Sequence, residues 1–231
     1  MDVEIIAFDV FGTLVDWRSS IVSELGRVGG AAGLSADWAA VADSWRSRYA
    51  PALGRVVRGE APYHPLDVLH RAMLDEVAEE HGLQALGDSQ RDELVRAWYR
   101  LAPWPDTVPG LTVLRDRHVL TPLSNGGLGL LTRLAKSAGL PFDCIVSAEL
   151  AGSYKPDPRV YRLVPDFFEV APEKVLMVAC HPGDLEHAAK AGLRTAFISR
   201  PLEWGPGRTA PAPPAAVDVV APDLIALAAR V

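Results

Sequence analysis

Short apolar runs alternate with helix-like segments over most of this chain, and this alternation restricts the fold more than any other feature. The runs lie at residues 3–8, 119–123, 144–146, 175–179 and 195–198. They are short and apolar, which is typical of buried strands. Helical periodicity occupies residues 128–138, 158–168 and 183–191. Strands that alternate with helices predict a parallel sheet with helices on both faces.

The stretch from residue 17 to residue 101 lacks this alternation. One helical stripe is formed by Trp38, Val41, Ala42, Trp45 and Tyr49. A second stripe runs from Leu66 to Val77, and Ser89 with Asp92 resembles a capping box. The fold class is therefore predicted to be α/β, a Rossmann-like parallel sheet core with an inserted α-helical cap. Residues 1–16 and 102–231 form the predicted core, and residues 17–101 the predicted cap.

Composition excludes several classes of protein. With 23 Lys and Arg against 29 Asp and Glu, the formal net charge is −6, so no basic surface for nucleic acid is expected. No apolar run is long enough for a membrane span, and Asp2 and Glu4 argue against a signal peptide. The two cysteines, Cys144 and Cys180, predict a reducing, cytoplasmic setting. The proline-rich residues 201–214 are predicted to be an irregular surface segment.

Polar side chains follow four of the predicted strands. Asp9 follows the first strand, Ser124 and Asn125 the second, Lys155 lies beyond the third, and His181 and Asp184 follow the fourth. Each has an ordinary structural explanation when taken alone, since Asp is a turn former and a single His is usually structural. Functional groups gather beyond the carboxyl ends of strands in open parallel sheets. Their joint placement therefore predicts one site.

These residues also resemble a known family. Residues 9–14, DVFGTL, look like the nucleophile motif of the haloacid dehalogenase superfamily, and Ser124-Asn125 resembles its second motif. Lys155 with Tyr161 resembles the lysine motif, and Asp184 the acidic fourth motif. More narrowly, the chain is similar to type II (S)-2-haloacid dehalogenases. This resemblance implies hydrolytic dehalogenation of short 2-haloalkanoic acids to 2-hydroxyacids.

Two departures from phosphatase motifs favour carbon–halide chemistry over phosphoryl transfer. Phosphatases of the superfamily carry an acid two residues after the nucleophile, and here that residue is Phe11. An alkoxide leaving group needs a proton, whereas a halide does not. Ala179 and Cys180 stand where a second acidic metal ligand is expected. No metal or other cofactor is therefore predicted. A Mg²⁺-dependent small-molecule phosphatase is the alternative, and a degenerate binding protein is a second rival.

The resemblance implies a role for each motif residue. Asp9 forms an ester with the substrate, Lys155 keeps Asp9 ionised, and Asp184 positions or activates water. Thr13 and Ser124 bind through their hydroxyls, with Ser124 on the substrate carboxylate. Further substrate-binding roles fall to Asn125, which faces the departing halide, to Tyr161, and to Phe11 in the apolar wall.

Two assignments are less direct. His181 stands where type II enzymes have Asn, so it either shares the activation of water or only forms a hydrogen bond with Asp184 or Lys155. Trp45-Arg46 resembles the Trp-Arg pair of the family, so Arg46 is expected to bind the halide or the carboxylate, with Arg18 and Arg48 as rivals. The expected partner is a small 2-haloacid, and a homodimer is expected by family analogy.

Overall fold

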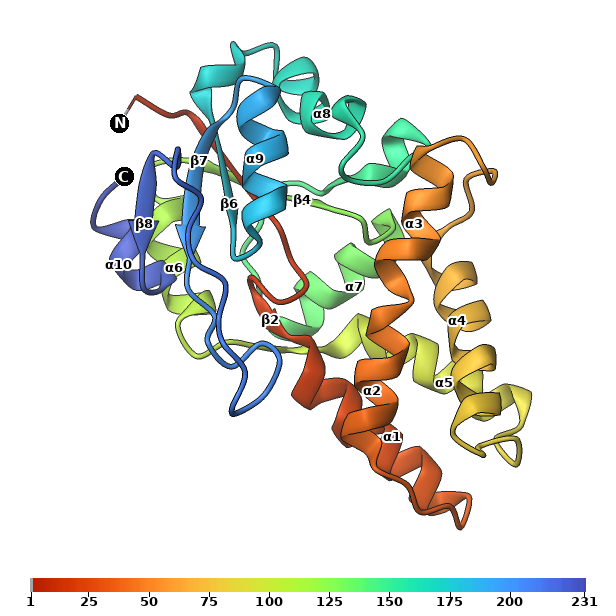
Figure 1. The fold of residues 1–231 in the computed structure, drawn as a ribbon. Coiled ribbons are helices and arrows are strands. Elements are labelled where there is room, and N and C mark those ends of the chain that lie inside the picture. Colours follow the sequence, from red (N-terminus) through yellow and green to blue (C-terminus); the bar gives the residue numbers. More distant parts are fainter. Residues whose placement is uncertain (1) are drawn as a thin grey trace.

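A computed structural model describes residues 2–231. Its centre is a six-stranded sheet with the strand order β5-β4-β1-β6-β7-β8 (Figure 1). The strands are β1 (Ile5–Phe8), β4 (Val119–Ser124), β5 (Val146–Ser147), β6 (Val175–Ala179), β7 (Arg194–Ile198) and β8 (Val219–Ala221). Every pairing in this sheet is parallel, with Ile5 opposite Val119 on one side and Val175 on the other. All strand ends that carry polar motifs therefore meet at one edge.

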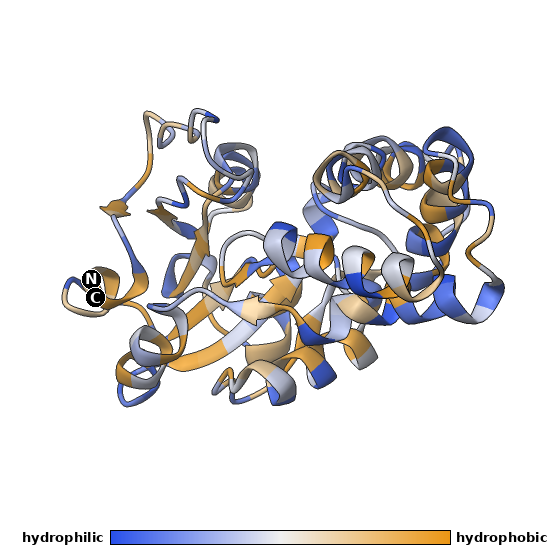
Figure 2. Cartoon of the chain, turned by 90° about the horizontal axis from the view of Figure 1, so that it is seen from below, coloured by the Kyte–Doolittle hydropathy of each residue, from blue (hydrophilic) through white to orange (hydrophobic). Residues whose placement is uncertain are grey.

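Helices cover both faces of the sheet because its strands alternate between two apolar cores. Ile6 and Phe8 of β1 pack into the core that includes α6 (Thr107–Arg115), α7 (Leu128–Ala138) and α10 (Leu224–Ala228). Ile5 and Ala7 pack into the core that includes α8 (Pro158–Phe168) and α9 (Pro182–Lys190). Figure 2 shows the strands mostly in hydrophobic colours, whereas the helices also carry hydrophilic stretches. The predicted α/β fold class is confirmed.

The region between β1 and β4 is mainly helical. It contains α1 (Trp17–Ala31), α2 (Trp38–Ser47), α3 (Tyr49–Val57), α4 (Leu66–Glu80), α5 (Asp88–Ala97) and the short 3₁₀ helix η1 (Trp98–Arg100). Their buried side chains join the core that contains Ile6 and Phe8. The short strands β2 (Val15–Asp16) and β3 (Ala102–Pro103) pair antiparallel at the two ends of this region. The division into core and cap at residues 16 and 101 stays a prediction.

Two local predictions are wrong. The stripe that was predicted as one helix from Trp38 to Tyr49 is split, because α2 ends at Ser47 and α3 begins at Tyr49. The α5 helix begins at Asp88, before Ser89, and the Gly87 N–H donates to Gln90 Oε1 at 2.9 Å. Gln90 therefore fills the capping role that the sequence pattern gave to Asp92.

Candidate active site

The carboxyl end of β1 leads directly into the tight turn that presents Asp9. The Asp9 N–H donates to the Val178 carbonyl at 2.9 Å, which extends the ladder between β1 and β6 by one residue. The turn then closes through Leu14 N–H to Val10 O at 2.9 Å. Gly12 has φ +89°, and a Cβ there would lie 2.3 Å from Glu203 Oε1. Glycine is thus required both for the backbone conformation and for the close approach of a carboxylate.

Three cationic or hydroxyl groups hold the Asp9 carboxylate. Thr13 Oγ1 donates to Oδ2 at 2.8 Å, and His181 Nδ1 lies 3.0 Å from the same oxygen. Lys155 Nζ lies 3.5 Å from Oδ1. Burial raises the pKa of Asp9, but the charge of Lys155 and the hydrogen bond and charge of His181 outweigh it and hold the pKa below its ordinary value. Asp9 is therefore ionised at neutral pH, and its Oδ1 has one long contact only.

Lys155 bridges the two aspartates of the site. Its ammonium lies 2.7 Å from Asp184 Oδ2, and the Tyr161 hydroxyl donates to Asp184 Oδ1 at 2.7 Å. Burial lowers the pKa of Lys155, but the charges of Asp184 and Asp9 outweigh it and raise the pKa. Burial and the charge of Asp184 raise the pKa of Tyr161, which stays a donor. Asp184 is thus held by two donors at the start of α9.

His181 lies between two carboxylates. Its Nδ1 is 3.0 Å from Asp9 Oδ2, and its Nε2 is 2.9 Å from Glu203 Oε1. Burial lowers the pKa of His181, but the neighbouring Cys180 and the hydrogen bonds to Asp9 and Glu203 outweigh it and raise the pKa well above its ordinary value. Since an ionised carboxylate only accepts hydrogen bonds, both ring nitrogens must carry protons. His181 is therefore an imidazolium in the free site.

A cavity of about 420 Å³ opens onto these groups. Its floor comes from strand ends and loops of the sheet, and its opposite wall comes from Arg46, Tyr49 and Ala50 of the helical region. The remaining lining residues are Asp9, Phe11, Asn125, Lys155, Pro156, Tyr161, His181, Gly183, Asp184, His187 and Trp204. The cavity thus combines a few charged groups with aromatic walls, as small-molecule sites do.

The structure separates the three candidate arginines by their partners. Arg18 forms a bidentate pair with Asp43 at 2.7 and 3.0 Å. Arg48 donates to Ser44 and pairs with glutamates of α4. Arg46 instead lines the cavity, with its guanidinium 4.1 Å from the Tyr49 ring centroid, and its buried Nη1 has no partner within residues 2–231. Of the three, Arg46 is the one with an available donor at the site.

Two of the predicted substrate-binding hydroxyls do not line the cavity. Thr13 is fully buried, donates to Asp9, and accepts from the Cys180 N–H at 3.0 Å. Ser124 is also fully buried, and its Oγ accepts from the Gly126 N–H at 3.3 Å. Asn125 does line the cavity, and its Oδ1 accepts from the Lys155 N–H at 2.7 Å, so its amide nitrogen is turned toward the cavity side that Tyr49 also lines. Phe11 lines the cavity and packs edge-on against Trp98.

Sequence reasoning missed several residues of the site, among them Glu203, Trp204 and Tyr49. The prediction that residues 201–214 form only a surface segment is wrong for Glu203, whose exposed fraction is 1%. Arg200 anchors the start of the segment, since it donates to the Thr13 carbonyl at 2.8 Å and pairs with Asp106 at 2.8 Å. Tyr49 was assigned to a core stripe, but it begins α3 and its ring centroid lies 4.1 Å from the guanidinium of Arg46 at the cavity.

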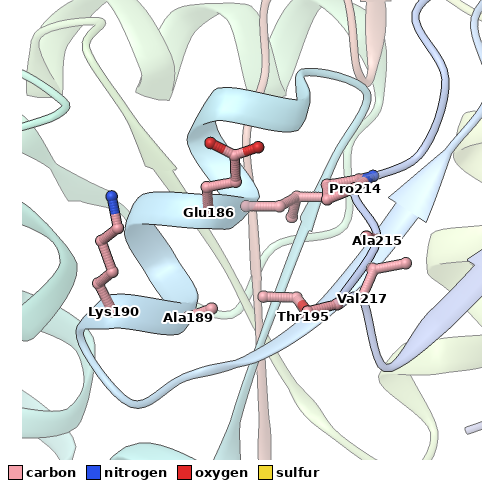
Figure 3. Close-up of a pocket in the computed structure, with 9 residues that line it drawn as sticks. Glu186, Ala189, Lys190, Thr195, Pro214, Ala215 and Val217 are labelled. Atoms are coloured by element: carbon pink, nitrogen blue, oxygen red, sulfur yellow. The ribbon is translucent and has the colours of Figure 1, made fainter.

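A second cavity, of about 300 Å³, lies away from this constellation, between α9 and residues 214–217. Figure 3 shows Glu186, Ala189 and Lys190 of α9 on one side and Pro214, Ala215 and Val217 on the other. Glu186 and Lys190 are both exposed. None of the groups that converge on Asp9 reaches this cavity, so the candidate active site is the first cavity.

The residues present do not fit a Mg²⁺ site. Asp9 and Asp184 supply oxygen ligands, but Lys155 Nζ lies between them, at 3.5 and 2.7 Å. A divalent cation beside a buried ammonium meets strong repulsion. Cys180, His181 and Glu203 are one group of potential ligands within the described chain. Both ring nitrogens of His181 are already engaged by carboxylates, at 3.0 Å from Asp9 and 2.9 Å from Glu203.

The fold and the site together define an α/β protein with a parallel sheet core and a buried carboxylate at the end of its first strand. The chain matches the model of the haloacid dehalogenase-like hydrolases over residues 3–192 and belongs to this family. It is similar to the solved structure of the defluorinating L-2-haloacid dehalogenase Rha0230, with 42% identity, a TM-score of 0.96, and coverage of 99% of this chain and 94% of that one.

Two further relatives are informative. The L-2-haloacid dehalogenase of Xanthobacter autotrophicus with chloropropionic acid covalently bound has 25% identity, a TM-score of 0.83, and coverage of 98% and 97% of the two chains. The (S)-2-haloacid dehalogenase 1 of Pseudomonas sp. (strain CBS-3) is 29% identical over 84% of this chain and 83% of its own length. Within residues 2–231, no helix is long and apolar enough to cross a membrane.

Proposed function

We propose that this chain hydrolyses short (S)-2-haloalkanoic acids to 2-hydroxyacids, with a transient ester on Asp9. The observation that carries this proposal is the geometry of the Asp9 carboxylate. Its Oδ2 is occupied by Thr13 and His181, whereas within residues 2–231 its Oδ1 has only the 3.5 Å contact with Lys155. An ionised oxygen with free lone pairs at the cavity is suited to displace a halide from carbon.

Substrate binding is assigned to the cationic wall of the cavity. The unpartnered Nη1 of Arg46 provides a charge-assisted donor for an anionic ligand. The amide nitrogen of Asn125 provides a neutral donor at the opposite wall, since its oxygen is already engaged. The carboxylate and the departing halide are the two anionic groups of a 2-haloacid, so these two donors match its two ends. Phe11 and Trp204 exclude water from the halide.

Chemistry proceeds in two displacements. Asp9 Oδ1 attacks the α-carbon from the side opposite the halogen, the carbon–halogen bond breaks, and halide leaves with the electron pair, so the carbon inverts. Water then attacks Cγ of the Asp9 ester and releases the 2-hydroxyacid. Asp184 is the proposed acceptor of the water proton, because Tyr161 and Lys155 fix both of its oxygens beside the nucleophile. The covalently bound chloropropionic acid in the Xanthobacter relative supports an ester intermediate.

We also propose that residues 17–101 act as a cap over the core. Arg46, Tyr49 and Ala50 supply one wall of the cavity, and the loops of the sheet supply the other. The phosphatase alternative is disfavoured, since Phe11 supplies no acid and Lys155 takes the place of a divalent cation.

Halide release from a panel of short 2-haloacids tests this function. We expect halide and 2-hydroxyacid in equal amounts from the (S)-enantiomers without added metal. Turnover of p-nitrophenyl phosphate with Mg²⁺, together with no halide from any 2-haloacid, would establish the phosphatase instead.

A further inference from the structure

A chain of three acidic and basic side chains runs from the reacting carboxylate into the protein interior. Asp9, His181 and Glu203 are linked by contacts of 3.0 and 2.9 Å. Glu203 also accepts from the Trp17 indole N–H at 3.2 Å and from the Cys180 thiol at 3.6 Å. Its exposed fraction is 1%, and its carboxylate is fixed by three donors from two parts of the chain, residue 17 and residues 180–181. Burial of such a carboxylate costs free energy unless the carboxylate is paired with a positive charge.

The charge that Glu203 stabilises is the imidazolium of His181. Burial raises the pKa of Glu203, but its hydrogen bond with His181 and the charges of His181 and Arg46 outweigh it and lower the pKa. In the free site, His181 therefore has two anionic partners, Asp9 and Glu203. Esterification of Asp9 removes one of these two charges. Glu203 is then the only carboxylate still in hydrogen-bond contact with His181.

The position of His181 decides which step benefits from its charge. His181 Nδ1 and Thr13 Oγ1 both contact Asp9 Oδ2, at 3.0 and 2.8 Å, and neither contacts Oδ1. If Oδ1 is the nucleophile, Oδ2 becomes the carbonyl oxygen of the ester. Water attack on Cγ moves the π-electron pair onto Oδ2, where a negative charge develops. Two donors already aimed at this atom form an oxyanion hole.

We infer that His181 and Thr13 stabilise the oxyanion formed on Asp9 Oδ2 during ester hydrolysis, and that Glu203 is a positioning residue that keeps His181 protonated for that step. The step balances as follows. One proton of the attacking water passes to Asp184, the Cγ–Oδ1 bond breaks as the carbonyl re-forms, and the product oxygen takes that proton from Asp184. The second water proton stays on the re-formed Asp9 carboxyl and is released to solvent when Asp9 ionises again. His181 keeps its proton throughout, so its role is that of a donor and it does not act as a base. This inference rests on the proposed function.

Glu203→Gln tests the inference, because it preserves the size of the side chain and removes its charge. The first turnover should release halide at close to the wild-type rate, since ester formation does not need the oxyanion hole. Hydrolysis of the ester should then be slower by about ten- to a hundredfold, less than the loss of a whole oxyanion donor. Intact-protein mass spectrometry during turnover should show the enzyme esterified on Asp9 accumulating.

The pH dependence adds a readout that a purely structural role would not change. The titratable groups in contact with His181 are Asp9, Cys180 and Glu203. Loss of the Glu203 charge lowers the pKa of His181 in the ester, so hydrolysis by the variant should decline at a lower pH than in the wild type. Glu186→Gln, an exposed amide substitution on α9, is the matched control and should behave as the wild type.

A double-mutant cycle separates this role from simple misfolding. His181→Asn retains a neutral donor near Oδ2 and loses the contact with Glu203, so adding Glu203→Gln to it should have little further effect on hydrolysis. Equal slowing of the halide burst and of steady-state turnover in Glu203→Gln, or full additivity in the cycle, would refute the inference. Absence of any halide release by the wild type from 2-haloacids would refute the proposed function instead.

Discussion

Acid should destabilise this protein through one buried histidine outside the active site. His70 lies on α4 with an exposed fraction of 1%, and its ring centroid is 4.4 Å from that of Trp98. Within residues 2–231, neither of its ring nitrogens has a hydrogen-bond partner. Burial, aided by the charge of Arg46, lowers the pKa of His70 from 6.5 to about 3. The folded protein therefore keeps His70 neutral at pH values where the unfolded chain protonates it.

The size of the effect follows from the two pKa values. Above pH 6.5 both states are neutral at His70, so the full stability is present. As the pH falls from 6.5 towards 3, the unfolded state binds a proton that the folded state does not, so stability is lost. At pH 5 the loss amounts to about 2 kcal/mol. This is a large fraction of the ~5–15 kcal/mol that stabilises a typical domain.

Urea unfolding of wild type and His70→Leu at pH 7 and pH 5 measures this term. We expect the wild type to lose about 2 kcal/mol more free energy of unfolding than the variant between the two pH values. At pH 7 the variant should be no less stable, since it removes two unpartnered polar atoms. His64→Gln, at an exposed side chain just before α4, should follow the wild type. An identical loss in the wild type and in His70→Leu would refute the reasoning.

Three further predictions concern the active site. Asp9→Asn should fold normally and lose turnover, because an amide is a poor nucleophile. Halide release by this variant, with deamidation excluded by mass spectrometry, would contradict the covalent mechanism. Arg46→Gln should lower kcat/KM by about ten- to a hundredfold because a charged donor is lost, whereas the matched Arg18→Gln should change kcat/KM little. Equal effects of the two substitutions would argue against Arg46 as the anion-binding residue. Exhaustive EDTA treatment should leave 2-haloacid turnover unchanged because Lys155 supplies the positive charge, and activity that returns only with Mg²⁺ would overturn the assignment.

The sheet could be predicted because its longer strands have a recognisable pattern in the local sequence. Buried β1 and β6 are short apolar runs, and helices α7 and α8 begin and end where their periodicity begins and ends. The α6 helix was not predicted, because three prolines lie around its start, Pro103, Pro105 and Pro109, and proline is uncommon inside helices. Pro109 lies in the first turn, where a missing N–H costs nothing. The two-residue strands β2 and β3 carry no pattern long enough to detect.

The candidate site was predictable to the extent that its residues follow strands. Asp9, Lys155 and Asp184 meet because parallel strands end at one edge of the sheet. The choice of Arg46 over its rivals needed the structure, because it depends on which arginines already have carboxylate partners. Glu203 left no local signal, since its partner Trp17 is 186 residues away in the sequence.

A single turnover in ¹⁸O-water tests the central claim most directly. With enzyme in excess over a 2-haloacid, water attacks the ester carbonyl and leaves its oxygen on Asp9, while the product takes Oδ1. Mass spectrometry of the peptide that contains Asp9 should therefore show one ¹⁸O atom, and the 2-hydroxyacid should carry none. Label in the hydroxyacid after the first turnover, with an unlabelled Asp9, would show that water attacks the substrate carbon directly and would contradict the account.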